Sequence, residues 1–271
     1  MKIARPVTYF GITLFSMCLL AGCVTSSTTS SSKQDGDAMT VAGPDKSDNQ
    51  RRARIRLQLA SEYYQQGQMN VALDEVKLAL QTDPEFSDAY SMAGLIYMDL
   101  GETRLAEENF TRALRLAPND PDLSNNYGWF LCQNGRAQQS IAYFESAIRN
   151  KAYRSPAKAL NNAGTCSLIL KDAVTAERYF NEAFRYDPGN PTTNTNLSRI
   201  NYERGDFERA RFYITRVTKA DVLTAEVLWL AIKVERKMGD RASEASFVTQ
   251  LRRRYPNSNE FAAYQRGAFN E

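Results

Sequence analysis

The chain has 271 residues, 24% of them charged and 43% hydrophobic, and a formal net charge of +3. This length suits one elongated domain or two compact ones. Lys2 and Arg5 lie in a segment that we expect to be removed, which leaves a nearly neutral chain without the basic surface of a nucleic-acid-binding protein. Histidine is absent, which excludes imidazole bases and the usual zinc ligand sets.

Residues 1–22 are predicted to form an export signal. Lys2 and Arg5 give it a positively charged start, and residues 7–20 form a mostly apolar run. That run is too short to span a membrane comfortably, but it has the length of the apolar part of a signal peptide.

The apolar run ends in a motif that resembles the lipobox of bacterial lipoproteins, made of Leu20, Ala21, Gly22 and Cys23. Small residues before the cleaved bond fit a narrow protease site, and only a thiol can form the thioether to diacylglycerol. The resemblance implies that Cys23 becomes the first mature residue and carries lipid, with several acyl chains giving firm anchoring. The alternative is an ordinary signal peptide, or a short anchor, with an incidental cysteine. Val24 stands where an aspartate favours retention in the inner membrane, so we expect anchoring at the periplasmic face of the outer membrane.

Residues 23–52 are expected to hold the lipidated cysteine and a flexible tether. The stretch 24–50 is rich in Ser, Thr, Gly and Asp and has almost no large apolar side chains, so it cannot bury a core. A flexible chain of this length has a root-mean-square reach of roughly 30 Å.

From residue 53 onward the sequence is periodic. Gly67, Gly101 and Gly135 are 34 residues apart, and this period resembles that of the tetratricopeptide repeat, which has two antiparallel helices per unit. Small residues at the eighth and twentieth positions let the two helices approach, and aromatic residues at the eleventh and twenty-fourth fill the space between them. Glycine at the fifteenth position turns the chain, and proline at the thirty-second ends the second helix.

The period lengthens by two residues once, because Phe144 and Phe180 are 36 residues apart. We place the insertion in the loop 150–155, before a helix that Ser155 and Pro156 would open. The sixth repeat departs from the pattern, as terminal repeats often do. The prediction is an all-α fold, a right-handed superhelical solenoid of six tetratricopeptide repeats with a short C-terminal capping helix. The expected repeats are 53–86, 87–120, 121–156, 157–190, 191–224 and 225–258, with the cap at 259–271.

The expected binding surface of such a solenoid is a concave groove lined by the first helix of each repeat. Asn126, Asn162 and Asn196 recur at the sixth repeat position, and Asn125 and Asn161 at the fifth. Asparagine offers both donors and an acceptor, so a row of them can bind the amides of an extended peptide. The alternative is that these residues suit the first turns of helices, where asparagine bonds free backbone groups. Pockets for partner side chains are expected at Tyr64, Met98, Trp129, Leu168 and Tyr202.

Cys132 and Cys166 occupy nearly the same place in the first helices of adjacent repeats. In an oxidising periplasm we expect a disulfide, which stabilises by about 3–4 kcal/mol on the chain-entropy estimate. The alternative is a pair of buried free thiols that pack as small apolar groups.

Nothing in the sequence predicts a catalytic residue, a metal site, a cofactor or a small-molecule substrate. A catalytic thiol would lack a histidine to activate it, and there is no phosphate-binding motif or enzyme signature. The arginine-rich runs 51–54 and 252–254 are interpreted as solvated helix faces, with contact of 51–56 to anionic lipid head groups as the alternative.

Two segments carry a family resemblance: NNYGWFLC at 125–132 and NNAGTC at 161–166. Together with the lipobox, the polar tether and six repeats, they resemble the type IV pilus biogenesis and stability lipoproteins, the pilotins of the PilF and PilW type. The stretch 56–80 is also similar to that family. The resemblance covers essentially the whole mature chain. The repeat motif is generic, whereas the two Asn-Asn…Cys segments are more specific.

The resemblance implies a non-enzymatic protein that escorts the secretin of the pilus machinery to the outer membrane, or helps its multimeric ring to form. The lipid would then serve sorting, and the groove would hold a secretin segment. The alternatives are a scaffold lipoprotein of another envelope complex, such as outer-membrane barrel assembly, and a regulator of peptidoglycan enzymes.

Overall fold

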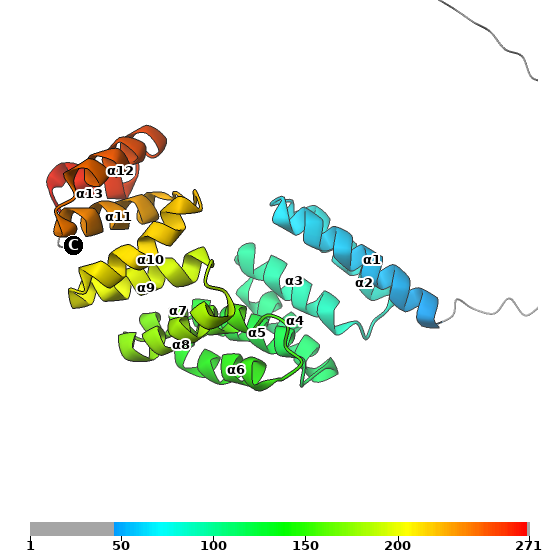
Figure 1. Cartoon of the computed structure of the whole chain (residues 1–271). Coiled ribbons are helices and arrows are strands. Elements are labelled where there is room, and N and C mark those ends of the chain that lie inside the picture. Colours follow the sequence, from blue (N-terminus) through cyan, green and yellow to red (C-terminus); the bar gives the residue numbers. More distant parts are fainter. Residues whose placement is uncertain (1–45, 270–271) are drawn as a thin grey trace, which may run out of the picture. The chain divides into compact units, whose positions relative to one another are not determined.

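The computed structural model describes residues 46–269. Over that range the chain forms thirteen α-helices and no strand (Figure 1). The predicted signal peptide, Cys23 and the tether as far as residue 45 lie outside the described residues. The helix bounds are α1 (Lys46–Gln65), α2 (Met69–Thr82), α3 (Ser87–Asp99), α4 (Thr103–Leu116), α5 (Pro121–Gln133), α6 (Ala137–Arg149), α7 (Pro156–Ile169), α8 (Ala173–Tyr186), α9 (Pro191–Arg204), α10 (Phe207–Lys219), α11 (Ala225–Met238), α12 (Arg241–Arg254) and α13 (Asn259–Arg266).

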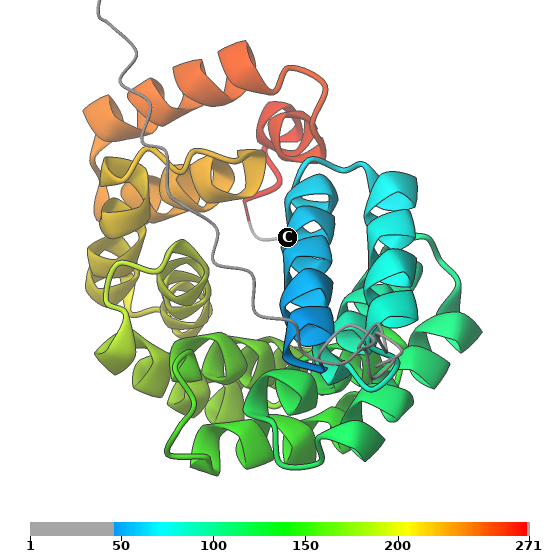
Figure 2. The same cartoon turned by 90° about the vertical axis from the view of Figure 1, so that its right-hand side faces the viewer.

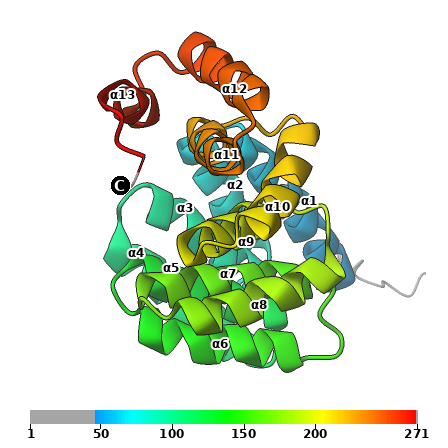
Figure 3. The ribbon, with the colours of Figure 1, turned by 60° about the vertical axis from the view of Figure 1, so that its left-hand side comes forward.

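The first twelve helices pack as six successive antiparallel pairs, one for each predicted repeat, although α1 and α7 begin before the predicted first and fourth repeats. Odd-numbered helices contact one another along the stack, for example α1 with α3 and α5 with α7, so they form its inner row. Each even-numbered helix packs against its own partner, and α2, α4, α6, α8 and α10 also pack against the next odd-numbered helix (Figures 2 and 3). The predicted all-α solenoid of six repeats with a C-terminal cap is confirmed.

Helix α1 begins seven residues before the predicted first repeat. Residues 46–52, which we expected to be tether, are helical, and Arg51 pairs with Asp48 one turn earlier, 2.9 Å away. The stretch lacks glycine and proline, and Pro44 lies just before it. Nothing in it therefore opposes extension of the helix that the core nucleates at Ala53 and Ala60, which are fully buried.

Within a repeat, one small and one large residue set the distance between paired helices. A methyl group added at Gly94, Gly128 or Gly164 would lie 2.8, 2.9 or 2.7 Å from the ring of Phe110, Phe144 or Phe180, respectively. All three rings are buried. The predicted role of the eighth and twenty-fourth repeat positions therefore has a direct steric basis.

The turn inside five repeats contains a left-handed glycine, for example Gly135 with φ of 77°. The fourth repeat has Lys171 there, with φ of 61°. The loop that holds the two-residue insertion is tied down by Asn150, whose amide donates to the Asn119 carbonyl at 3.0 Å. Tyr153 of the same loop is buried against Ala147 and Ala159.

The C-terminal end of the stack is covered by α13, which packs on α11. Trp229 is the centre of this contact, with its ring 5.2 Å from that of Phe269 and 6.5 Å from that of Tyr264. Behind it lie the buried Leu228 and Ile232. The chain after α13 therefore returns to the inner row of helices, where Phe269 contacts repeat six.

Candidate protein-binding surface

The three asparagines at the sixth repeat position lie on consecutive inner helices: Asn126 on α5, Asn162 on α7 and Asn196 on α9. All three are partly exposed. Each stands in the second turn of its helix, because Pro121, Pro156 and Pro191 open these helices. The repeat geometry thus brings the predicted column together on one face.

Two of these side chains also hold neighbouring repeats together. The Asn126 amide donates to the Ser91 hydroxyl at 3.1 Å, which links α5 to α3. The Asn162 amide donates to the Asn125 carbonyl oxygen at 2.9 Å, which links α7 to α5. Asn125 in turn donates to Asn126 at 3.2 Å, so four side chains on three helices form one continuous polar chain.

Asn125 is fully buried, and Asn161 is only 6% exposed, at the wall of a hollow between α7 and α9. Asn161 accepts a hydrogen bond from the Thr193 hydroxyl at 2.7 Å, between α7 and α9. An amide buried without partners is costly, and these bonds satisfy it. In this structure both side chains align the inner helices. Direct contact of the fifth-position residues with a partner stays a prediction.

Asn196 behaves differently from the other two members of the column. Its amide donates to the Thr192 carbonyl of its own helix at 3.0 Å, and its oxygen accepts from Arg199 at 3.3 Å. Asn196 therefore has the alternative role, in which an asparagine bonds the backbone of its own helix.

Asn126 and Asn162 keep bonding capacity for a ligand. An asparagine has two donor hydrogens and an oxygen with two acceptor sites. The bonds between repeats use one donor of each side chain, and the Asn126 oxygen also accepts from Lys158 at 3.4 Å. The second donor of each amide remains for an extended peptide that crosses the inner row.

The aromatic and apolar residues predicted to form pockets are all partly buried. Trp129 packs on the cluster around the two cysteines, and Met98 on that around Phe110. Tyr64 donates to Asp99 at 2.6 Å, across the first two repeats, and its burial raises its pKa, as does the Asp99 carboxylate. Tyr202 faces a hollow between α9 and α11.

Three hollows follow the inner row in its C-terminal half. One of about 420 Å³ includes Lys158, Asn161 and Asn162, and a second of about 220 Å³ includes Asn196 and Arg199. The largest of the three, about 680 Å³, lies between the C-terminal halves of α9 and α11. We call it the α9–α11 hollow. It is lined by Arg199, Tyr202, Glu203, Arg204, Gly205, Phe207, Lys233, Lys237 and Phe269.

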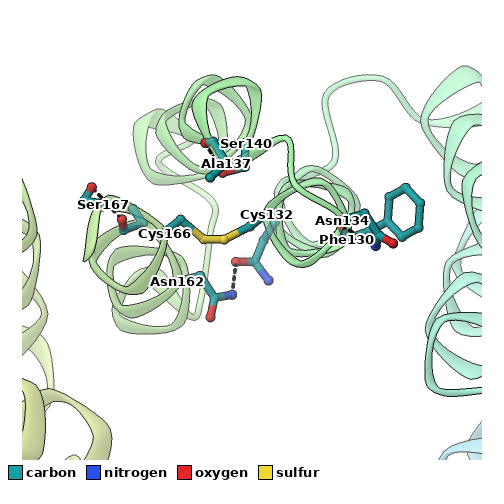
Figure 4. Close-up of a disulfide and its surroundings, with 10 residues drawn as sticks. Phe130, Cys132, Asn134, Ala137, Ser140, Asn162, Cys166 and Ser167 are labelled. Atoms are coloured by element: carbon teal, nitrogen blue, oxygen red, sulfur yellow. Dashed lines mark hydrogen bonds between the residues drawn. A yellow bond between two sulfur atoms is a disulfide. The ribbon is translucent and has the colours of Figure 1, made fainter. Parts of the chain in front are cut away.

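Cys132 of α5 and Cys166 of α7 are joined by a disulfide, with Cα atoms 5.9 Å apart (Figure 4). This spacing is usual for the bond. Both residues are buried in a cluster with Phe144, Leu160 and Tyr179. Asn162 lies one turn before Cys166, so the bond from Asn162 to Asn125 and the disulfide hold the same two inner helices.

Several residues of this surface were not singled out from the sequence. Ser91 and Thr193 complete the polar contacts between repeats, and Lys158 adds a cation beside Asn126. A signal was present for Ser91, which stands at the same repeat position as Asn125 and Asn161. The two lysines of the α9–α11 hollow, Lys233 and Lys237, carried no repeat signal, because they belong to the degenerate sixth repeat.

Two further observations concern residues 46–269 alone. No helix in that range is long and apolar enough to cross a membrane. No cluster of three or more acidic or cysteine side chains in that range could hold a metal ion.

Comparison with known proteins agrees with this geometry. A family model described as tetratricopeptide repeat matches residues 91–155 and 133–191, and a second one of the same description matches 168–230. The type IV pilus assembly protein PilF of Pseudomonas aeruginosa is 28% identical over 246 residues, which cover 91% of this chain and 93% of that protein.

Two solved structures extend the likeness to three dimensions. The crystal structure of PilW, described as a widely conserved type IV pilus biogenesis factor, is 30% identical with a TM-score of 0.70, and the match covers 79% of this chain and 98% of that one. The structure of Pseudomonas aeruginosa PilF is 26% identical with a TM-score of 0.74, over 81% and 99% of the two chains. The chain belongs to this family of type IV pilus biogenesis proteins built from tetratricopeptide repeats. Such folds are typical of proteins that act by binding other proteins.

Proposed function

We propose that this protein is a lipid-anchored pilotin at the periplasmic face of the outer membrane. It binds the secretin of the type IV pilus machinery and promotes the localisation and multimer assembly of that secretin. The proposal is carried by the match to PilF and PilW along nearly the whole described chain. The lipobox at Cys23 supports the membrane anchor, and the accessible amides of the inner row support peptide binding.

In this proposal the lipid, the tether and the repeats each have a separate role. Lipid on Cys23 confines the protein to the membrane surface, and the tether before α1 lets the repeats search a short distance from it. Confinement to the membrane surface raises the local concentration of the protein beside a partner in the same membrane. A weak contact between the inner row and a secretin segment is then sufficient to retain and gather subunits.

Complementation of a deletion strain tests this function. We expect loss of pili in the deletion strain, with secretin present but monomeric or mislocalised. The wild-type gene should restore heat-resistant secretin multimers in the outer-membrane fraction. The Cys23→Ser variant should remain unprocessed or misplaced and should not restore them. Normal multimers in the outer membrane of the deletion strain would contradict the proposed function.

Variants of the asparagine column test whether the inner row binds secretin. A triple variant with Asn126→Ala, Asn162→Ala and Asn196→Ala should bind secretin at least tenfold more weakly, because each lost hydrogen bond costs about 0.5–1.5 kcal/mol. The matched control replaces with alanine the exposed Asn70, Asn181 and Asn257, none of which belongs to an inner helix. Thermal unfolding of the same preparations separates lost contacts between repeats from lost binding. Unchanged affinity of the triple variant would place the binding surface elsewhere, first on repeats one and two around Tyr64 and Met98.

A further inference from the structure

The two ends of the stack differ, because α13 covers the C-terminal end whereas the face of α1 at the N-terminal end is open (Figure 1). Ile55 of α1 shows the difference, since it is 55% exposed. In the later repeats its position is occupied by residues that are all buried, namely Ala89, Leu123, Ala159, Thr193 and Val227. Within the described residues no helix packs on α1 from the preceding side. The end of the stack thus exposes an apolar side chain at a position that neighbouring repeats cover elsewhere.

A hollow of about 760 Å³ lies on this open end, between the first half of α1 and the end of α2. Two arginines, two apolar residues and three neutral polar residues line it: Asn49, Arg52, Ile55, Arg56, Leu59, Gln81 and Thr82. We call residues 46–59 of α1, together with this hollow, the α1 tip. The tip therefore combines cations and apolar side chains on one surface.

The net positive charge of the described chain is concentrated at the α1 tip. Residues 46–56 contain one acidic residue, Asp48, and five basic ones, Lys46, Arg51, Arg52, Arg54 and Arg56. The remainder, residues 57–269, has 26 lysines and arginines and 26 aspartates and glutamates. Residues 57–120, which follow the tip directly, have 11 acidic and four basic residues. A negatively charged surface therefore attracts the tip and repels the two repeats behind it, which favours one orientation of the solenoid.

Contacts inside the protein leave this positive charge in excess. Arg52 donates to the side-chain oxygen of Asn49, which is a neutral group. Three carboxylates interact with the other arginines of the tip: those of Asp48, Glu75 and Asp88. With all three counted, the five cations still exceed the carboxylates by two. The argument depends on this excess, and it does not require any one arginine to be unpaired.

From this geometry we propose that the α1 tip binds the surface of a membrane that contains anionic phospholipids. Arg52 and Arg56 contact lipid phosphates, and Ile55 enters the boundary between head groups and acyl chains. The contact holds the solenoid in one orientation at the membrane, with the acidic second repeat turned away.

This inference rests on the lipid anchor of the function proposed above. Only 22 residues separate Cys23 from α1, so an anchored chain holds the tip, and not the far end of the stack, close to the membrane. A second copy of the chain is disfavoured as the occupant of this surface, because two tips of the same charge repel each other.

Co-sedimentation with lipid vesicles tests the site. The protein is the mature-length chain with Cys23→Ser, which carries no lipid, and the vesicles are phosphatidylcholine with or without phosphatidylglycerol. We expect binding to the anionic vesicles to be about tenfold tighter or more at low ionic strength. The difference should shrink as salt is added, because the charges are exposed. Equal binding to the two kinds of vesicle would overturn the proposal.

A matched pair of variants locates the contact on the protein. Arg52→Gln with Arg56→Gln should weaken binding to the anionic vesicles about tenfold, since each cation near such a surface adds to the attraction. Arg252→Gln with Arg253→Gln removes the same charge from the exposed end of α12 and should change the binding little. If both double variants lose affinity equally, the vesicles read only net charge and the tip is not the site. Circular dichroism confirms that both variants are folded.

The apolar part of the tip has its own variant. Ile55→Ser should weaken binding even at high salt, where the attraction of the arginines is screened. Sedimentation equilibrium of the same chain without vesicles examines the second copy as occupant. Dimers that Ile55→Ser abolishes would make the tip an interface between copies, contrary to the proposal.

The vesicle assay contains neither a lipidated Cys23 nor secretin. Its failure would therefore leave the function proposed above standing. Normal secretin multimers in the deletion strain would contradict that function without changing the vesicle result.

Discussion

At the residue scale, the helix pairs show how one sequence period accommodates different side chains. Where the first helix has glycine, as at Gly164, the second has phenylalanine, as at Phe180. The first repeat instead pairs Ala60 with Val76. A larger residue on one helix thus accompanies a smaller one on the other, and the space between the helices stays filled.

This complementarity predicts that one substitution changes the free energy of unfolding in opposite directions, depending on the residue that it packs against. Gly164→Ala should destabilise the wild-type protein by about 1 kcal/mol, because overpacking against Phe180 costs about 1–3 kcal/mol and outweighs the helix propensity gained, about 0.8–1.0 kcal/mol. In a Phe180→Val background the same substitution should stabilise, since the ring that it would strike is gone. Denaturant unfolding of the four proteins in this cycle measures both effects. A destabilising effect of equal size in both backgrounds would show that the ring is not the cause.

The asparagines show which properties of single residues the repeat frame could predict and which it could not. The repeat frame placed Asn126, Asn162 and Asn196 on one face, and the structure has them there. The frame could not say that Asn125 is fully buried, because burial depends on the rotation between successive repeats. That rotation is set by many side chains at once, and no single position in the sequence encodes it.

At the scale of the element, the second helices of the six repeats start in two ways. Asp172, Asp206 and Asp240 cap α8, α10 and α12 by accepting hydrogen bonds from backbone amides. Gln68, Glu102 and Arg136 stand at the same position before α2, α4 and α6 without a capping bond from the side chain. The N-terminal half of the solenoid therefore lacks a stabilising contact that the C-terminal half has three times.

Removing a capping side chain should lower the stability, and introducing one should raise it. Asp206→Ala should destabilise by about 1 kcal/mol, and Glu102→Asp should stabilise by a smaller amount, because aspartate is among the best capping residues. Amide hydrogen exchange measures the effect locally, in α10 for the first variant and α4 for the second. An equal loss of protection in all helices would instead indicate a global effect unrelated to the cap.

Acid should weaken the same caps. Hydrogen bonds from Thr175 lower the pKa of Asp172, and those from Ser243 lower the pKa of Asp240. For a carboxylate with a lowered pKa, the added stability is present above the ordinary aspartate value and is lost as the pH falls through the lowered one. We expect α8 and α12 to lose protection against hydrogen exchange below pH 4, before helices that have no such cap.

For the whole molecule, the sequence predicted the number of repeats, their helix pairs and the place of the two-residue insertion, because each depends on local contacts that recur. It did not predict the early start of α1, since the composition of residues 46–52 resembles the polar stretch before it. The α9–α11 hollow could not be predicted from the sequence either. It forms where Phe269 returns to the inner row, and a contact between Tyr202 and a residue 67 positions later has no signal in a 34-residue period.

The link between Cys132 and Cys166 also has a mechanical consequence. On the function proposed above, the protein is fixed to a membrane through its N-terminus, and a pilus component bound to the repeats pulls on the chain. Load applied along the chain passes from α5 to α7 through the two sulfur atoms, so α6 bears none of it. The 34 residue steps enclosed by the bond, about 110 Å of extended chain, are withheld from extension until the bond is reduced. Single-molecule stretching should therefore show a contour length greater by that amount in the presence of a reducing agent, and an equal length in both conditions would mean that the bond is absent.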